Sequence, residues 1–139
     1  MKHLNVLLLV VSATILGACS KNPSAAIGER VMRKLVQNNS NGCVEVVSYN
    51  KTNGVLRETG GAKTYDLECN VTIKFAQECW FKTFGEFEAF KTDGMNDSVD
   101  ANRPAGYERH SKGDHLILLR KLKFELTDNG WRDQWGDVY

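Results

Sequence analysis

The chain has 139 residues, of which 42% are hydrophobic and 25% are charged. This length and composition are typical of one small globular domain together with processing signals. The first 18 residues contain one basic residue, Lys2, and no acidic one, so the rest of the chain has equal numbers of basic and acidic side chains. Such a balanced chain has no broad electric field that would attract nucleic acid, and we expect no nucleic-acid partner.

The N-terminus has the pattern of an export signal. Lys2 and His3 form a short positive segment, and residues 4–16 form an apolar run interrupted by only a few polar side chains. A bilayer-spanning helix needs about twenty apolar residues, so this run is too short to span a membrane but suits a secretory signal. The run ends in Leu16-Gly17-Ala18-Cys19.

These last four residues resemble the lipobox of bacterial lipoprotein precursors. The resemblance implies that residues 1–18 are removed, that the Cys19 thiol carries a diacylglyceryl group, and that the new amine is acylated, for example with palmitate. Because two or more acyl chains hold a protein almost permanently, we expect the membrane to be a partner through this lipid anchor. Ser20 resembles the sorting residue of outer-membrane lipoproteins, which implies the periplasmic face of that membrane. The alternative is a secreted protein whose signal happens to end near a cysteine.

After a short tether at residues 19–23, we expect residues 24–139 to form a single domain. Ser24 can cap a helix, because its hydroxyl can accept a hydrogen bond from the first turn. Apolar residues then recur at every fourth position, and the polar run at residues 38–42 is a stop signal. The pattern predicts one helix between these two signals. The apolar positions are Ile27, Val31 and Leu35.

The following segments have the two-residue period of β-strands. Valine-rich residues 43–49 predict a strand, with turn residues at 50–54 and at Gly60-Gly61 breaking the chain after it. Residues 65–75 alternate apolar and polar side chains without exception. This alternation predicts an antiparallel strand with one buried face, and a similar pattern predicts another strand at residues 116–126.

A final hairpin is predicted at the C-terminus. The Asp-Asn-Gly sequence at 128–130 is typical of a hairpin turn, and residues 131–139 would supply the returning strand. Two registers remain open. A two-residue loop sets Trp135 opposite Phe124 and Asp133 opposite Leu126. A three-residue loop places Arg132 and Gln134 on the core face instead.

One helix followed by about four antiparallel strands predicts an α+β fold, because the apolar face of the sheet needs a cover and the helix supplies it. This order is similar to the cystatin-like and nuclear-transport-factor-like architectures, in which a curved sheet wraps around a helix. The short segments at residues 51–54, 121–125 and 129–131 also resemble segments of small exported bacterial proteins of that kind. These families include enzymes, inhibitors and scaffolds, so the resemblance implies a fold and no particular activity.

Three cysteines remain once Cys19 is lipidated, so at most one internal disulfide forms in an oxidising compartment. Folding the first strand back on the second about the double-glycine turn brings Cys43 opposite Cys79, which predicts that pair. Cys69 lies on the apolar face of its strand, where a buried thiol is common. A Cys69–Cys79 bond and the absence of any disulfide remain as alternatives. The cysteine spacings match no zinc pattern, so we expect neither a metal nor another cofactor.

Residues 76–113 are far longer than a hairpin connection needs, and we interpret them as an aromatic-rich insertion. One interpretation is a hydrophobic cluster that covers one end of the sheet. The other is an aromatic-walled site for an apolar ligand or a partner protein. The phenylalanines lie three apart, a spacing that suits one side of a helical turn. The aromatic residues are Trp80, Phe81, Phe84, Phe87 and Phe90.

No arrangement in the sequence is typical of a catalytic site. His110 and His115 lie five residues apart across Gly113, a spacing that places them together on neither a helix nor a strand. We therefore expect a monomeric, envelope-anchored domain that binds a ligand, or an envelope protein as its partner, without catalysis; the sequence does not identify the ligand. The alternative is a nuclear-transport-factor-like enzyme or small-molecule site, because Arg120 projects with apolar neighbours where a pocket between helix and sheet would lie.

Overall fold

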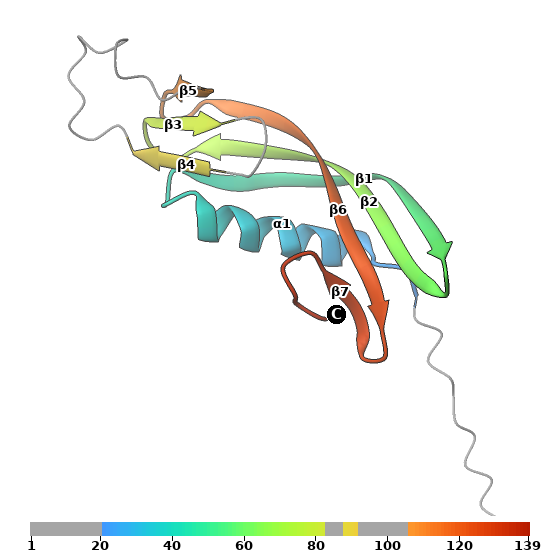
Figure 1. Ribbon diagram of the computed structural model, residues 1–139. Coiled ribbons are helices and arrows are strands. Elements are labelled where there is room, and N and C mark those ends of the chain that lie inside the picture. Colours follow the sequence, from blue (N-terminus) through green and yellow to red (C-terminus); the bar gives the residue numbers. More distant parts are fainter. Residues whose placement is uncertain (1–20, 83–87, 92–105) are drawn as a thin grey trace, which may run out of the picture.

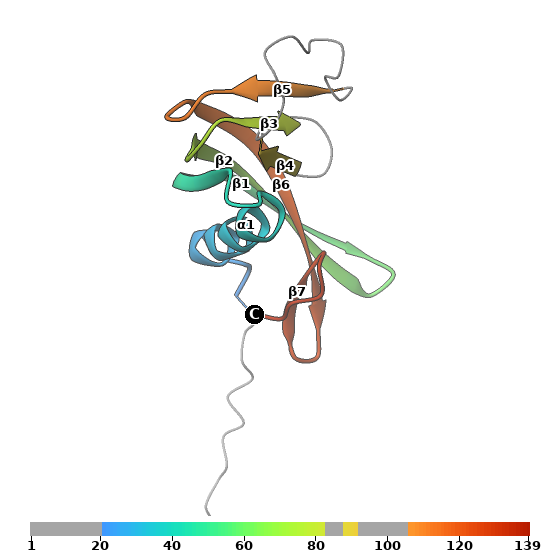
Figure 2. The same ribbon diagram turned by 90° about the vertical axis from the view of Figure 1, so that its left-hand side faces the viewer.

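The computed structural model describes residues 21–82, 88–91 and 106–139. Its helix, α1 (Ala25–Asn39), lies along one face of a twisted antiparallel sheet with the strand order β1-β2-β6-β7 (Figure 1). A smaller sheet, with the order β4-β3-β5, lies at the end of the molecule remote from β7 (Figure 2). This arrangement confirms the predicted α+β fold. The strands are β1 (Val44–Thr59), β2 (Ala62–Phe75), β3 (Cys79–Lys82), β4 (Glu88–Lys91), β5 (Tyr107–His110), β6 (His115–Thr127) and β7 (Gly130–Asp133).

The helix begins and ends where the sequence predicts. Ser24 caps its N-terminus, since the Ser24 Oγ accepts a hydrogen bond from the Ile27 amide at 3.3 Å. At the other end, the backbone N–H of Ser40 donates to the carbonyl oxygen of Val36. Gly42 follows with a φ of 74°, a left-handed conformation that glycine adopts without strain. The buried residues of the helix are Gly28, Val31, Met32 and Val36.

Gly28 lies in the helix at the point where the sheet comes closest. A Cβ at this position would lie 2.1 Å from the Tyr49 hydroxyl oxygen and 3.1 Å from Leu67 Cδ1. Glycine destabilises a helix interior by about 1 kcal/mol relative to alanine, but no larger residue fits here. The residue with the weakest helix propensity in this segment therefore allows β1 and β2 to pack directly against α1.

The predicted break at residues 50–54 is wrong, because β1 continues through them. One of the two irregularities in the pairing of β1 with β2, between Lys51 and Asn53, lies within these residues and accommodates them in the strand. Gly54 stays in the strand because the ring of Tyr65 packs onto it, and a Cβ there would lie 1.8 Å from the Tyr65 hydroxyl oxygen. The break at Gly60-Gly61 is confirmed, since both glycines have positive φ and join β1 to β2.

β2 is the central strand, with β1 on one side and β6 on the other. Its predicted buried face is confirmed: the six alternating apolar side chains from Tyr65 to Phe75 are each at most 4% exposed. β6 adds Leu118, Leu122 and Phe124 to the same core. The core therefore lies between α1 and the face of the sheet that turns toward it.

The last hairpin has a two-residue loop, Asp128-Asn129, as one of the two alternatives proposed, but its pairing differs from the one expected for that loop. Trp131 lies opposite Leu126, and Asp133 lies opposite Phe124. The strand also ends at Asp133 rather than continuing through residues 131–139. This places the Trp131 side chain in the core, where it is 3% exposed.

Asp133 explains why β7 is short. Its buried carboxylate accepts hydrogen bonds from the backbone N–H groups of Trp135 (2.9 Å) and Asp137 (3.0 Å). The hydroxyl of Tyr139 donates to the other carboxylate oxygen at 3.1 Å, and burial together with this charge raises the pKa of Tyr139 to about 12. A buried carboxylate needs such partners, and here they turn the chain back toward Trp131.

Part of the predicted insertion at residues 76–113 forms the second sheet. Phe81 is fully buried in β3, where it packs edge-on against Phe75. The ring of His110 stacks on the ring of Phe75 with a centroid distance of 4.3 Å. Phe81 therefore belongs to a strand rather than to the predicted helical turn, because the apolar contacts at the end of β2 favour an extended chain there.

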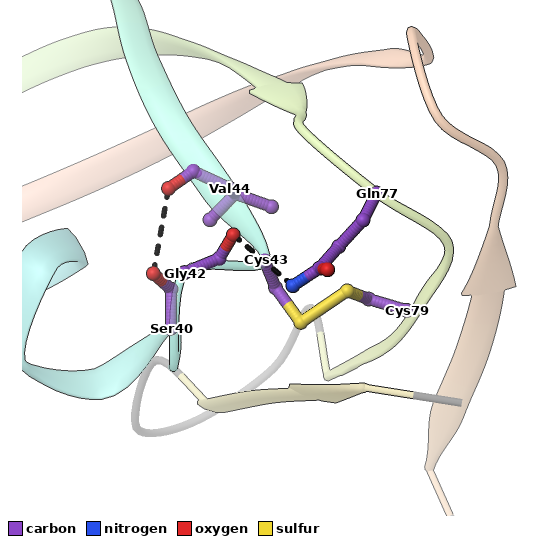
Figure 3. Close-up of a disulfide and its surroundings, with 6 residues drawn as sticks. All are labelled: Ser40, Gly42, Cys43, Val44, Gln77 and Cys79. Carbon is purple, nitrogen blue, oxygen red and sulfur yellow. Dashed lines mark hydrogen bonds between the residues drawn. A yellow bond between two sulfur atoms is a disulfide. The ribbon is translucent and has the colours of Figure 1, made fainter. Parts of the chain in front are cut away.

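The predicted disulfide joins Cys43, just before β1, to Cys79, the first residue of β3 (Figure 3). The Cα atoms are 6.0 Å apart, and the bond closes a loop with a sequence separation of 36. The side-chain amide of Gln77 donates to the Gly42 carbonyl oxygen at 3.3 Å and supports the same junction. Cys69 is a buried free thiol, as predicted. The disulfide thus ties the second sheet to the start of the main sheet.

Candidate functional site

The predicted aromatic site is not an open surface where the structure describes it. Phe81 is fully buried and Trp80 is 7% exposed, so neither side chain is accessible to a ligand or partner. Phe84, Phe87 and the side chain of Phe90 lie outside the described residues. Their role in binding stays a prediction, and the described part of the chain offers a different site.

This site is an open cleft between α1 and β6, with a volume of about 890 Å³. The second half of α1 forms one wall and the middle of β6 forms the other. The segment that follows β7 closes one end. We call it the α1–β6 cleft. Its walls include Lys34 and Leu35 of α1, Arg120 and Leu122 of β6, and Trp135 and Asp137 of the C-terminal segment.

The acidic side chains at this cleft are held by the fold. Asp137 forms an ion pair with Lys34 on the facing wall. Asp133 accepts the three hydrogen bonds that turn the chain after β7. Asp137 therefore ties the C-terminal segment to α1, and Asp133 holds the turn within that segment.

Arg120 brings a cation to the wall of the cleft, where the sequence pattern suggested a polar pocket. Burial lowers the pKa of its guanidinium group. Beside it, the Cys69 thiol donates a weak hydrogen bond to the Arg120 carbonyl oxygen at 3.6 Å. Burial raises the pKa of Cys69, so this thiol stays protonated and is a poor nucleophile.

β6 has a long stretch of edge that no described residue pairs with. β2 pairs with β6 on one side from His115 to Glu125. On the other side, β7 pairs only from Phe124 to Thr127. Residues 115–123 therefore form an edge that is open within the described structure, and we call it the β6 edge. It runs beside the α1–β6 cleft, since the middle of β6 belongs to both.

Large apolar side chains are exposed at this edge and at the end of the cleft. Ile117 and Leu119 are 64% and 82% exposed, and Trp135 is 48% exposed. The other C-terminal aromatic residues, Trp131 and Tyr139, pack against the core. The surface around the β6 edge therefore combines exposed apolar groups with the charged wall of the cleft.

The two histidines of the described chain lie in separate sheets. His110 pairs with Cys79 in the second sheet, and His115 pairs with Lys74 in the main sheet. Among the described residues, no three or more His, Cys, Asp or Glu side chains gather where they could hold a metal ion. The helix within the described ranges is too short and too polar to cross a membrane.

Comparison of the chain with known protein families, with curated proteins and with solved structures found no significant match in any of the three. The proposed function is therefore based on the geometry of the site and on the sequence. In the sequence, only Arg120 indicated a polar site between the helix and the sheet. The sequence contained no signal for Trp135, because the position of that residue depends on where the chain turns after β7.

Asp66 stabilises the exposed face of β2 near the β6 edge. It is 6% exposed, and its carboxylate lies 3.1 Å from the Lys121 ammonium and 3.3 Å from Arg57 Nε. Burial by itself would raise the pKa of Asp66, but the hydrogen bonds from Lys121 and Arg57 outweigh burial and lower it. A lowered folded-state pKa contributes stability above the unfolded-state pKa of about 4, and this is lost as the pH falls through the folded-state value.

We therefore predict that Asp66→Asn lowers the free energy of unfolding by about 1 kcal/mol at pH 7 and by much less near pH 3. Urea unfolding at the two pH values measures the difference. Glu68→Gln is the control, because Glu68 is exposed and lies 3.9 Å from Lys121. An equal loss of stability for Asp66→Asn at both pH values would contradict the assignment.

Proposed function

We propose that this protein is an envelope lipoprotein, anchored through Cys19, whose domain binds another envelope component at the α1–β6 cleft without transforming it. The lipobox-like sequence at residues 16–19 supports the anchor. The cleft supports binding, because its walls combine apolar side chains with charged ones, and burial keeps the neighbouring Cys69 thiol protonated.

The observation that carries the proposal is the way the chain is fixed directly after the proposed anchor. The indole N–H of Trp131 donates to the Lys21 carbonyl oxygen at 3.0 Å. Two residues later, Pro23 is fully buried, and the Lys51 ammonium approaches its carbonyl oxygen at 3.4 Å. The domain therefore begins within two residues of Cys19.

This short connection sets how far the domain can stand from the membrane. Two residues reach about 7 Å when extended. The fixed end of the chain lies at the same end of the molecule as β7 and the C-terminus, and the second sheet lies at the other end (Figure 2). A lipid on Cys19 would thus hold the β7 end near the bilayer and point the second sheet away from it.

A second candidate function is the binding of a small anionic molecule in the α1–β6 cleft. The partly buried guanidinium of Arg120 favours it, because a cation at a wall of mixed polarity attracts an anionic group. The two candidates share the site and differ in the size of the ligand.

The proposed lipid anchor can be tested by measuring the incorporation of labelled palmitate into the protein in a bacterial host. The wild-type chain should take up the label and remain with the membranes, whereas Cys19→Ser should lose both properties. Cys69→Ser is the matched control and should keep the label, since its thiol is buried in the core. A mature protein with an unmodified Cys19 thiol, or with residues 1–18 still attached, would refute the anchor.

Binding at the cleft can be tested with a photoreactive amino acid placed at Trp135 in living cells. We expect a discrete cross-linked product with an envelope component from this position. Lys112, exposed in the turn before β6, is the control position and should give none. Equal products from both positions would argue against the cleft, and a small molecule that co-purifies with the protein would favour the second candidate.

A further inference from the structure

The β6 edge presents main-chain hydrogen-bonding groups to the outside of the sheet. In an antiparallel ladder, successive residues direct their N–H and C=O groups alternately to the two neighbouring strands. Trp131 and Asp133 direct theirs away from β6, toward Tyr139 and Asp137. The residues of β7 that bond to β6 are therefore Gly130 and Arg132.

The same alternation fixes which groups of β6 face outward. Gly130 and Arg132 lie opposite Thr127 and Glu125, so the odd-numbered residues of β6 direct their backbone groups toward the β7 side. No residue of β7 pairs with the odd-numbered residues of β6 that precede Phe124. The N–H and C=O groups of Ile117, Leu119 and Lys121 consequently form a row that can accept another strand.

A strand added at this edge would have two different faces. One face would lie beside the exposed side chains of Ile117 and Leu119. The other would lie over the α1–β6 cleft, with side chains directed toward Leu35 and Trp135. Strand addition gives affinity through main-chain hydrogen bonds and specificity through pockets for alternate side chains. The β6 edge offers both.

Charge indicates what kind of strand fits. Residues 115–123 carry Arg120, Lys121 and Lys123 and no acidic residue, although Lys121 already forms ion pairs with Asp66 and Glu68 of β2. Two copies of this edge would bring six such cations together, and lysines on an edge strand oppose pairing of that kind. A segment with acidic side chains would instead be attracted.

We propose that the β6 edge accepts an extended, acidic segment of a different polypeptide as an additional strand of the main sheet. The proposal rests on the proposed binding function of the cleft and names the class of partner for it. It does not depend on the lipid, so loss of the label in Cys19→Ser and loss of strand addition are separate outcomes.

The test uses the full-length protein purified in detergent and a synthetic peptide of nine residues in which Glu and Val alternate, with blocked ends. Calorimetry measures its Kd. Two control peptides carry N-methyl groups on every Val or on every Glu, so that each has lost the N–H donors of one edge. We expect one control to bind like the parent and the other to lose binding, because only one edge of a strand pairs with β6. Undiminished binding of both controls would overturn the proposal.

Substitutions in β6 test the same main-chain contact by changing the protein instead of the peptide. Leu119→Pro removes an outward N–H while leaving the groups that pair with β2, and it should raise the Kd of the parent peptide by at least about tenfold. Leu119→Thr keeps the N–H and should change the Kd much less. Equal Kd values for the two variants, with matching circular dichroism spectra, would overturn the proposal. A peptide-free protein that is already a dimer through this edge would identify a second copy as the occupant and also overturn it.

Discussion

The structure depends on the pairing of β2 with a strand on each of its sides. Because β2 buries one complete face, the sheet needs a cover, and α1 supplies it through the close approach at Gly28. Because both edges of β2 are occupied, β6 is an outer strand along most of its length in the part of the chain that the structure describes. The short β7 covers only the end of β6, so the cleft and the β6 edge follow from this one pairing pattern.

The elements that sequence analysis predicted correctly are those with a local cause. The strict alternation of apolar and polar side chains from Tyr65 to Phe75 predicts a strand with one apolar and one polar face, independently of the elements that pack against it. The cap at Ser24 and the left-handed residues after α1 fix the helix ends through backbone chemistry. The disulfide could be predicted because the double-glycine turn sets which residues return to the level of Cys43.

The elements that sequence analysis missed are those decided by tertiary contacts. Residues 50–54 have the composition of a turn, but pairing with β2 and the ring of Tyr65 hold them in a strand. The final hairpin takes its register from Asp133, whose carboxylate is stable in the interior only because three donors converge on it. Of the candidate site, Arg120 could be identified from its pattern. Trp135 and the β6 edge could not, because both depend on how early β7 ends.

The proposed anchor and the proposed strand addition complement each other. A domain fixed within two residues of a lipid is confined to a thin layer at the membrane surface, where a weakly bound segment of a neighbouring protein has a high local concentration. An open edge is suited to such a partner, since main-chain pairing tolerates many sequences.

Native-state amide hydrogen exchange of the ligand-free protein measures whether the β6 edge is open. With an open edge we expect slow exchange for Leu118 and Arg120, whose N–H groups face β2, and exchange at least about tenfold faster for Leu119 and Lys121. Equally slow exchange for both pairs in a monomeric protein would mean that the chain covers its own edge, which would leave no place for an added strand.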